Sequence, residues 1–373
     1  MKNLLYLLIL TSVFACQTSK NNAVKVPSQG IIGALPTTAA KPKNIILMIG
    51  DGMGMSAISA AMYRNGSKLN LERFPITGIH KSNASSHLVT DSAAGATAFS
   101  CGCKTYNGSI GMNKDTLPCK TILEEAIQHG LATGMVATST IVHATPAAFV
   151  AHQKDRNMYE EIANDFLNVP IDIFIGGGKK FFDRRQDNRN LITALQKKGY
   201  TIFDYTQEEI SQIKIPKGKK FGYFTADKDP LPVVQGRDYL PQATMKTINY
   251  LHESNGNGFF AMIEGSQIDW GGHANKADYI ISEMLEFDIV IGQVLDWAAR
   301  NGETLVIVTA DHETGGFAIQ PESTQDSIIA AFTTTGHTAE MIPVFAFGPG
   351  ANQFSGIYEN TAIHTKMKKI LGW

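Results

Sequence analysis

The stretch KNIILMIGDGMGMS, residues 43–56, places an aspartate between glycines at the end of an apolar run. The apolar run predicts a buried β-strand, and a strand followed by a glycine-rich turn and a helix is typical of nucleotide-binding α/β folds. The spacing of Gly50, Gly52 and Gly54 misses the G-x-G-x-x-G pattern. The carboxylate of Asp51 would also repel phosphate unless a cation lay between them. A metal site at this turn therefore requires further ligands elsewhere in the chain.

Apolar segments alternate with helical patterns along the rest of the chain, which indicates a doubly wound α/β fold with a mostly parallel central sheet and helices on both faces. Several of the expected strands are apolar on both faces, as buried parallel strands are. The predicted strands are 44–50, 132–138, 171–175, 258–264, 304–310 and 342–347. The predicted helices are 120–129, 158–167, 190–198, 241–254, 277–300 and 358–371. Residues 180–240 break the alternation, and we expect an inserted or looser subregion there.

The length and charge of the chain restrict its function. A chain of 373 residues suits one large α/β domain or two smaller ones, with ample material for a core. The formal net charge of −1 excludes the basic excess that accompanies general nucleic-acid binding. A charged substrate must therefore be attracted by charges at its binding site and not by the net charge of the whole chain.

The first sixteen residues have the pattern of an export signal. Lys2 precedes an apolar run over 4–14 that is too short to span a bilayer, and the motif VFAC, which is similar to a bacterial lipobox, ends at Cys16. We expect lipid attachment at Cys16, with ordinary signal cleavage as the alternative. Residues 17–43 would form a flexible tether to the domain at 44–373. The expected location is the cell envelope, periplasmic or outer-membrane associated, with the lipid as the only membrane contact.

Acidic and imidazole side chains follow several of the predicted strands. Because open α/β sheets bind ligands beyond the carboxyl ends of their strands, these side chains are expected at one edge of the sheet. The candidate ligands are Asp51, Glu264, Asp269, His273, Asp311, His312 and His337. This pool of oxygen and nitrogen donors without thiolates suits zinc, magnesium or manganese. Gly271 and Gly272 make a regular helix between Asp269 and His273 doubtful.

A candidate nucleophile lies in HLVTDSAAGATAFSCG, where the chain becomes alanine-rich after Ser92. Ser92 is therefore expected at a helix start, where N–H groups and the helix dipole favour an anion. A metal ion there could lower the pKa of the hydroxyl enough for attack. By itself the pattern favours an ordinary N-cap over a nucleophile.

Six blocks of the sequence together resemble the alkaline phosphatases in order and spacing. The resemblance runs from about residue 43 to the C-terminus. The blocks are IGDGMG, VTDSAAGATAF, HATPAAFVAH, IEGSQIDWGGHAN, VTADHETGG and GHTAEMIPVFAFGPGA. This resemblance implies that the chain hydrolyses small phosphate monoesters through a phosphoserine intermediate.

The resemblance also implies a division of labour among the candidate residues. One zinc would be held by Asp269, His273 and His337, and the second zinc by Asp51, Asp311 and His312. Magnesium would be held by Asp51, Thr145 and Glu264. Ser92 would be the nucleophile, Arg156 would bind two phosphate oxygens, and Asp91 would orient Arg156.

Two positions depart from the pattern of some family members. His143 stands where some have an aspartate near the magnesium, and Trp270 stands where some have a lysine. We expect His143 to modulate the third metal site, which makes magnesium less secure than the zinc pair.

The residues alone leave two alternative functions open. The main alternative is a phosphodiesterase or sulfatase of the same superfamily, although Ser92 and Arg156 favour monoesters. A non-catalytic, metal-dependent phosphate-binding lipoprotein is the alternative from another class, but it would not need an activated serine. The sequence does not decide between a monomer and a homodimer.

Three cysteines follow the candidate nucleophile. In an oxidising compartment, two of Cys101, Cys103 and Cys119 are expected to pair. Cys103 follows the expected helix end at Gly102, and Cys119 precedes the next helix, so a Cys103–Cys119 disulfide would close the excursion between them. The rival Cys101–Cys119 pair is harder to form, because two residues in a helix separate positions 101 and 103 by about 200° around its axis and only one of them can face the loop.

Overall fold

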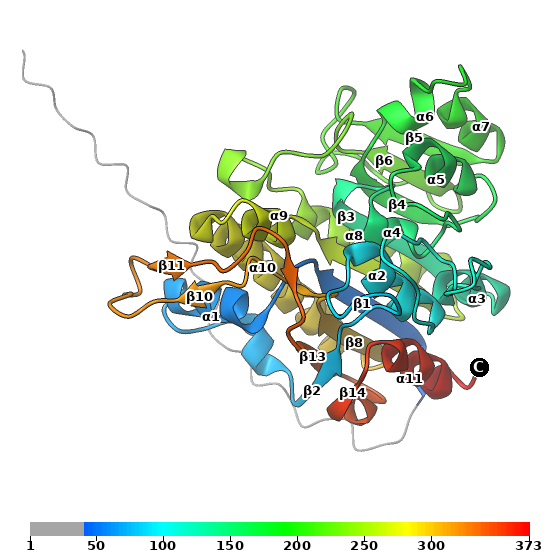
Figure 1. Cartoon of the computed structure of the whole chain (residues 1–373). Helices are drawn as coiled ribbons and strands as arrows, with labels where there is room; N and C mark the ends of the chain where they lie inside the picture. Colours follow the sequence, from blue (N-terminus) through cyan, green and yellow to red (C-terminus); the bar gives the residue numbers. More distant parts are fainter. Residues whose placement is uncertain (1–40) are drawn as a thin grey trace, which may run out of the picture. The chain divides into compact units, whose positions relative to one another are not determined.

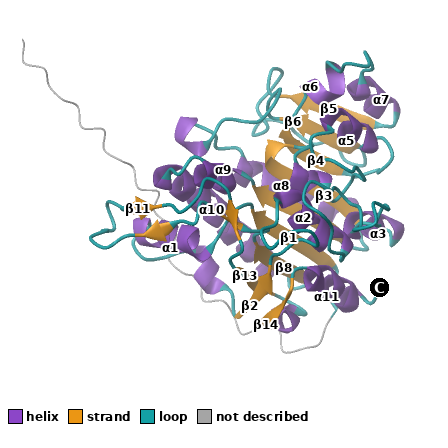
Figure 2. Ribbon diagram, in the orientation of Figure 1, coloured by secondary structure: helices purple, strands orange, loops and turns teal. Residues whose placement is uncertain are grey.

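The computed structural model describes residues 41–373. The expected signal segment with Cys16, and all of the expected tether except its last three residues, lie outside the described residues. The chain from residue 41 onward is built around a ten-stranded sheet (Figures 1 and 2). Its strands are β1 (Asn44–Gly50), β2 (Ile76–Lys81), β3 (Ala132–Thr140), β4 (Ile173–Gly177), β5 (Tyr200–Asp204), β6 (Lys220–Phe224), β7 (Phe259–Gly265), β8 (Thr304–Thr309), β13 (Ile342–Phe347) and β14 (Gly356–Glu359).

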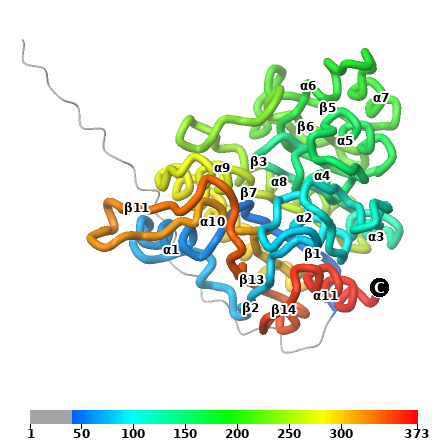
Figure 3. Tube along the Cα trace, in the orientation of Figure 1, coloured from blue at the N-terminus to red at the C-terminus, as the bar shows by residue number. Residues whose placement is uncertain are grey.

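The order of the strands is β14-β2-β13-β8-β1-β7-β3-β4-β6-β5. From β8 to β5 every neighbouring pair is parallel, and β13 is antiparallel to both of its neighbours. All residues of β1 and β7 are buried, because helices cover both faces of these central strands. Figure 3 shows that β2, from the first part of the domain, lies beside β13 and β14 from its end.

Helices pack in two groups against the sheet. Helices α8 and α10 contact each other and the central strands, whereas α2, α3, α4 and α11 form the second group. The helices are α1 (Met55–Arg64), α2 (Ser92–Cys101), α3 (Ile122–Gln128), α4 (Ala144–Ala147), α5 (Tyr159–Asp165), α6 (Lys180–Asp183), α7 (Leu191–Lys197), α8 (Leu240–Ser254), α9 (Gln267–His273), α10 (Ala277–Asn301) and α11 (Thr361–Leu371). Within residues 41–373, no helix combines the length and the apolar character needed to cross a membrane.

Short elements complete the fold. The 3-10 helices are η1 (Asn70–Arg73), η2 (Val233–Gln235) and η3 (Ala351–Phe354). Two small antiparallel ladders pair β10 (Ala318–Ile319) with β11 (Ala330–Ala331), and β12 (His337–Thr338) with β9 (Glu313–Thr314). The β9–β12 pair positions His337, which is one of the candidate ligands.

The predicted doubly wound fold is confirmed, and all six predicted strands are present with shifts of at most two residues at their ends. Two expectations were wrong. The segment 180–240 contributes β5 and β6 to the central sheet, so it is not simply an insertion. The helix expected at 358–371 begins only at Thr361, because residues 356–359 pair with β2 as an edge strand.

Candidate metal centre and active site

The candidate residues meet at one edge of the sheet. Strands β8, β1, β7 and β3 are neighbours, and their carboxyl ends lie side by side. Asp51 follows β1 directly, Glu264 lies near the end of β7, and Asp311 comes just after β8. All three side chains are fully buried. The register of the parallel strands therefore brings together carboxylates that are far apart in the sequence.

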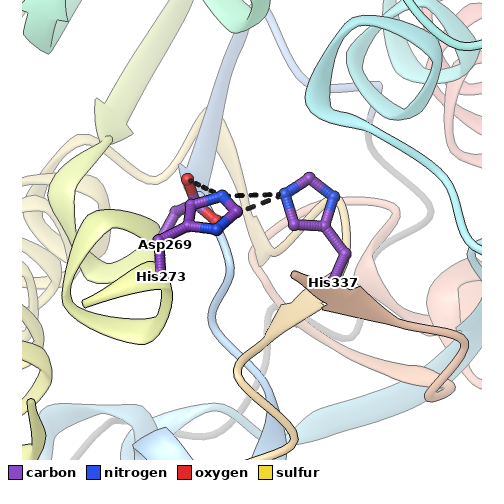
Figure 4. A group of neighbouring side chains, drawn as sticks. All are labelled: Asp269, His273 and His337. Carbon is purple, nitrogen blue, oxygen red and sulfur yellow. Dashed lines mark hydrogen bonds and ion pairs between the residues drawn. The ribbon is translucent and has the colours of Figure 1, made fainter. Parts of the chain in front are cut away.

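The first group of ligands consists of Asp269, His273 and His337 (Figure 4). Two of them project from α9, and His337 points toward them from β12. The Nε2 atom of His273 lies 3.3 Å from Asp269 Oδ2, and that of His337 lies 3.6 Å from Asp269 Oδ1. The two Nε2 atoms are 3.2 Å apart. This spacing lets one cation contact all three side chains.

A regular helix carries Asp269 and His273, contrary to our doubt about this segment. Its glycines serve close packing. A Cβ at Gly271 would lie 2.7 Å from the backbone nitrogen of Ile280, and one at Gly272 would lie 2.8 Å from the side chain of Thr314. The cost of glycine in a helix is therefore offset by the close approach of α9 to its neighbours.

The outer ring nitrogens of these histidines are engaged by the protein. His337 Nδ1 lies 2.8 Å from the carbonyl oxygen of Thr90, and His273 Nδ1 faces the carbonyl oxygen of Thr335. The carbonyl contacts place the hydrogens on Nδ1 and direct the Nε2 lone pairs inward, as in metal sites. Thr314 donates to Asp269 and lies 3.2 Å from His312 Nδ1, so it contacts ligands of two of the candidate groups.

The electrostatics of this group favour a positive charge between its members. The hydrogen bond to Asp269 raises the pKa of His273 to about 9, whereas burial and the neighbouring His312 lower the pKa of His337 to about 4. Although burial opposes its ionisation, Asp269 has a lowered pKa because of the three histidines around it. A divalent cation would supply the positive charge that this arrangement favours.

The second group consists of Asp51, Asp311 and His312, and all three are buried. His312 Nε2 lies 3.2 Å from Asp311 Oδ2 and 3.5 Å from Asp51 Oδ1. The backbone N–H of Gly52 donates to Asp311 Oδ1 at 3.2 Å, which fixes the orientation of that carboxylate. The group thus offers two carboxylate oxygens and one imidazole nitrogen.

The third group shares Asp51 with the second and adds Glu264 and His143. The hydroxyl of Thr145 donates to Asp51 Oδ2 at 3.4 Å, and Ser139 donates to Glu264 Oε2 at 3.4 Å. The other oxygen of Glu264 and the Nδ1 of His143 are buried without a hydrogen-bond partner in the described chain. Such atoms indicate a binding site for a cation or its water ligands.

Burial dominates the charge balance of the shared carboxylates. It raises the pKa of Asp51 well above the usual value, with further contributions from Asp311 and Asp269. Burial likewise raises the pKa of Glu264 to about 8. Carboxylates packed this closely resist ionisation unless cations neutralise them. Oxygen donors of this kind fit a hard divalent cation such as magnesium.

Ser92 is the first residue of α2 and faces the second group. Its Oγ lies 3.2 Å from His312 Nε2 and donates to Asp51 Oδ1 at 3.4 Å. The small residues of α2 permit this approach, since a Cβ at Gly95 would lie 2.9 Å from Asp311 Cβ. The structure therefore places the candidate nucleophile beside the carboxylates and at the positive end of a helix dipole.

Asp91 caps α2 and also holds Arg156. Its Oδ1 accepts from the N–H of Ala94 at 2.9 Å, and its Oδ2 accepts from Arg156 Nη1 at 3.0 Å and from the N–H of Gly108 at 2.9 Å. Burial disfavours charge on Arg156, but the nearby Asp91 more than offsets this and raises its pKa. A cationic fork is therefore held close to Ser92, where it suits a phosphate group.

His143 lies between Arg156 and Trp270. Its Nε2 is 3.4 Å from Arg156 Nη2, and its ring meets the ring of Trp270 edge-on with centroids 6.0 Å apart. Burial and the Arg156 charge lower the pKa of His143 to about 3. A neutral imidazole at this position adds a nitrogen donor, rather than a charge, to the third group.

The sequence did not identify the residues that support the ligands. Thr314 was missed, although its position two residues after His312 in ADHETGG offered a signal. The carbonyl groups of Thr90 and Thr335 carried no signal, because any residue type supplies a carbonyl. Three cysteines lie outside the metal groups: Cys101, Cys103 and Cys119. All three are free thiols in the described part of the chain. The predicted disulfide stays a prediction.

Comparisons with known proteins agree on one family. A family model described as alkaline phosphatase matches residues 42–331 and 325–373. Alkaline phosphatase 3 of Bacillus subtilis (strain 168) is 33% identical, with 88% of this chain and 89% of that protein aligned. The structure of alkaline phosphatase from the Antarctic bacterium TAB5 superposes with a TM-score of 0.84 at 45% identity, covering 89% of this chain and 98% of that one. A histidine-to-aspartate variant of the TAB5 enzyme, 44% identical with a TM-score of 0.83 over 89% of this chain and 99% of that one, has magnesium bound in its M3 site.

Proposed function

Because the chain belongs to the alkaline phosphatase family, whose members hydrolyse phosphate monoesters, we propose that it does so through a phosphoserine intermediate on Ser92. One observation carries this proposal: the Ser92 hydroxyl lies at a helix start within 3.4 Å of both Asp51 and His312. A phosphate-binding protein without catalysis would not need a hydroxyl in that place.

Two zinc ions and one magnesium ion are the proposed cofactors. The first zinc would bind Asp269, His273 and His337, and the second would bind Asp51, Asp311 and His312. Magnesium would bind Asp51, Glu264 and Thr145, whose donors are the oxygens that this hard cation prefers. When bound, such cations polarise phosphoryl oxygens, lower the pKa of coordinated hydroxyls and water, and stabilise the leaving oxygen.

The residues of the chain then perform two displacements. Ser92 Oγ forms a bond to phosphorus as the ester P–O bond breaks, and the alcohol leaves. Water next attacks the phosphoserine, releasing inorganic phosphate and restoring Ser92. Arg156 binds two of the phosphate oxygens through its planar fork, while Asp91 keeps that fork in position. Two in-line displacements retain the configuration at phosphorus.

The substrate class can be tested with three matched esters. Metal-loaded protein would be assayed with p-nitrophenyl phosphate, bis-p-nitrophenyl phosphate and p-nitrophenyl sulfate. We expect the monoester to have the highest kcat/KM by a wide margin. A preference for the diester or the sulfate would assign the chain to another activity of the superfamily.

Two further proposals concern the cellular state of the protein. We propose export and attachment to the cell envelope through lipid on Cys16, which rests on the signal pattern of residues 1–16. Metabolic labelling with a fatty acid should mark the wild-type protein but not Cys16→Ala. We also propose a homodimer, to be tested by light scattering of the protein without its signal segment.

A further inference from the structure

Three thiols converge where α2 ends. Cys101 is the last residue of that helix, Gly102 ends it in the left-handed conformation with φ 69°, and Cys103 follows. Cys103 Sγ lies 3.0 Å from Cys119 Sγ, across 16 positions of sequence. Cys101 Sγ instead contacts the carbonyl oxygen of Cys119, at 3.4 Å. The geometry therefore distinguishes one close sulfur pair from a third thiol.

The segment between the close pair supports the proposed phosphate site. Within it, the side-chain oxygen of Asn107 accepts from the N–H of Asp91 at 3.1 Å, and the N–H of Gly108 donates to Asp91 Oδ2. The carbonyl oxygen of Gly108 also accepts from the backbone N–H of Arg156 at 2.7 Å. Residues 103–119 thus hold both members of the Asp91–Arg156 pair.

We propose that Cys103 and Cys119 form a disulfide that closes residues 103–119 and keeps Asn107 and Gly108 against Asp91. The oxidant is a disulfide compound or a disulfide oxidoreductase. The Cys119 thiolate attacks one sulfur of the oxidant, which breaks the oxidant's S–S bond and releases one thiolate. The Cys103 thiolate then attacks Cys119 sulfur and releases the second thiolate. Two electrons pass to the oxidant, and both cysteine protons pass to solvent.

The pKa values of the thiols differ in the direction that this reaction requires. The neighbouring Cys101 thiol lowers the pKa of Cys119 to about 6, although burial opposes the shift, and this favours Cys119 as the attacking sulfur. The nearby thiols of Cys103 and Cys119, together with burial, raise the pKa of Cys101 well above its usual value. A disulfide needs Sγ atoms about 2.05 Å apart, so the contact between Cys103 and Cys119 requires only a small approach.

Peptide mapping without reduction tests the bond itself. The full-length chain, exported or treated with oxidised glutathione, should yield one linked Cys103–Cys119 peptide and a free Cys101. The variant Cys101→Ser should yield the same linked peptide, whereas Cys103→Ser should yield none. Three free thiols after glutathione treatment, or a peptide linked through Cys101, would overturn the assignment.

A binding measurement tests the consequence for the site, which rests on the proposed function. Calorimetric titration of metal-loaded protein with inorganic phosphate should give a several-fold higher Kd after reduction of the wild type and of Cys101→Ser. Cys103→Ser should show the higher Kd before reduction and no change on reduction. An unchanged Kd in the reduced wild type would refute the supporting role of the bond. If neither form bound phosphate while the linked peptide was present, the proposed function would fail and the disulfide would stand.

Discussion

Replacing Asp91 with asparagine removes the negative charge that holds Arg156. The two carboxylate oxygens serve opposite sides: Oδ1 accepts from Ala94, and Oδ2 accepts from Arg156 and Gly108. An asparagine amide has one acceptor oxygen, so its NH2 group must face N–H donors on one side. The side with two donors, one of them charged, should keep the oxygen, and the cap of α2 should then be lost.

The charged hydrogen bond between Arg156 and Asp91 sets the magnitude of the effect. A hydrogen bond to a charged group contributes roughly 1.5–3 kcal/mol. The side chains of Arg156 and Asp91 retain 21% and 17% exposure, so solvent screening favours the lower part of that range. Because the asparagine oxygen still accepts from Arg156, only the negative charge of the acceptor is lost, which is about half of that contribution. A loss of about 1 kcal/mol corresponds to a rise of about fivefold in the Kd for inorganic phosphate. We expect KM for p-nitrophenyl phosphate to rise in the same direction.

A matched N-cap variant controls for loss of the cap. Asn190 caps α7, outside the site, by accepting from the N–H of Thr193 at 2.9 Å. Asn190→Ala should cost about 1 kcal/mol of unfolding free energy and leave the Kd for phosphate unchanged. Calorimetric titration of metal-loaded protein measures both variants. An unchanged Kd in Asp91→Asn, or an equal rise in Asn190→Ala, would refute the reasoning.

Three further perturbations address the metals and one titrating pair. His143→Asp adds a third carboxylate to Asp51 and Glu264, and should raise the magnesium affinity at least about tenfold by calorimetry; an unchanged affinity would count against this third site. Exhaustive chelation should abolish phosphomonoester turnover, and zinc with magnesium should restore it, whereas full turnover by protein shown to be metal-free would exclude the mechanism. Burial opposes charge on His152, but its 3.2 Å contact with Glu124 raises its pKa above 6.5. A raised pKa stabilises the fold below the unfolded-state value and loses that effect as pH rises through the folded-state value. The unfolding free energy of wild type relative to His152→Gln should therefore fall as the pH rises above about 6.5, and a pH-independent difference would contradict the pairing.

The central strands and the ligands that follow them were predictable because the signal is local. A continuous apolar run such as residues 44–50 is typical of a strand buried on both faces, and Asp51 directly follows it. The edge elements were not predictable in the same way. Strands β5 and β6 have only five residues each, too few to show a clear alternation of apolar and polar residues. They join the sheet because β6 pairs with β4 and β5 pairs with β6.

The geometry of α9 and the supports of the ligands depended on tertiary contacts. Gly271 and Gly272 lower helix propensity, but Ile280 and Thr314 leave no room for a larger side chain there. A single sequence does not show which neighbours approach so closely. The dual role of Asp91, as a cap and as a partner of Arg156, likewise required the fold that brings residues 108 and 156 together.

The most direct test of the proposed chemistry is to trap the covalent intermediate. Metal-loaded wild-type protein would be mixed with a monoester carrying labelled phosphate, quenched rapidly in acid and digested for peptide mapping. The mechanism predicts labelled phosphate on the peptide that contains Ser92. It also predicts that Ser92→Ala shows no label and loses roughly three or more orders of magnitude in kcat. Label on a different residue, or full turnover by Ser92→Ala, would contradict the mechanism.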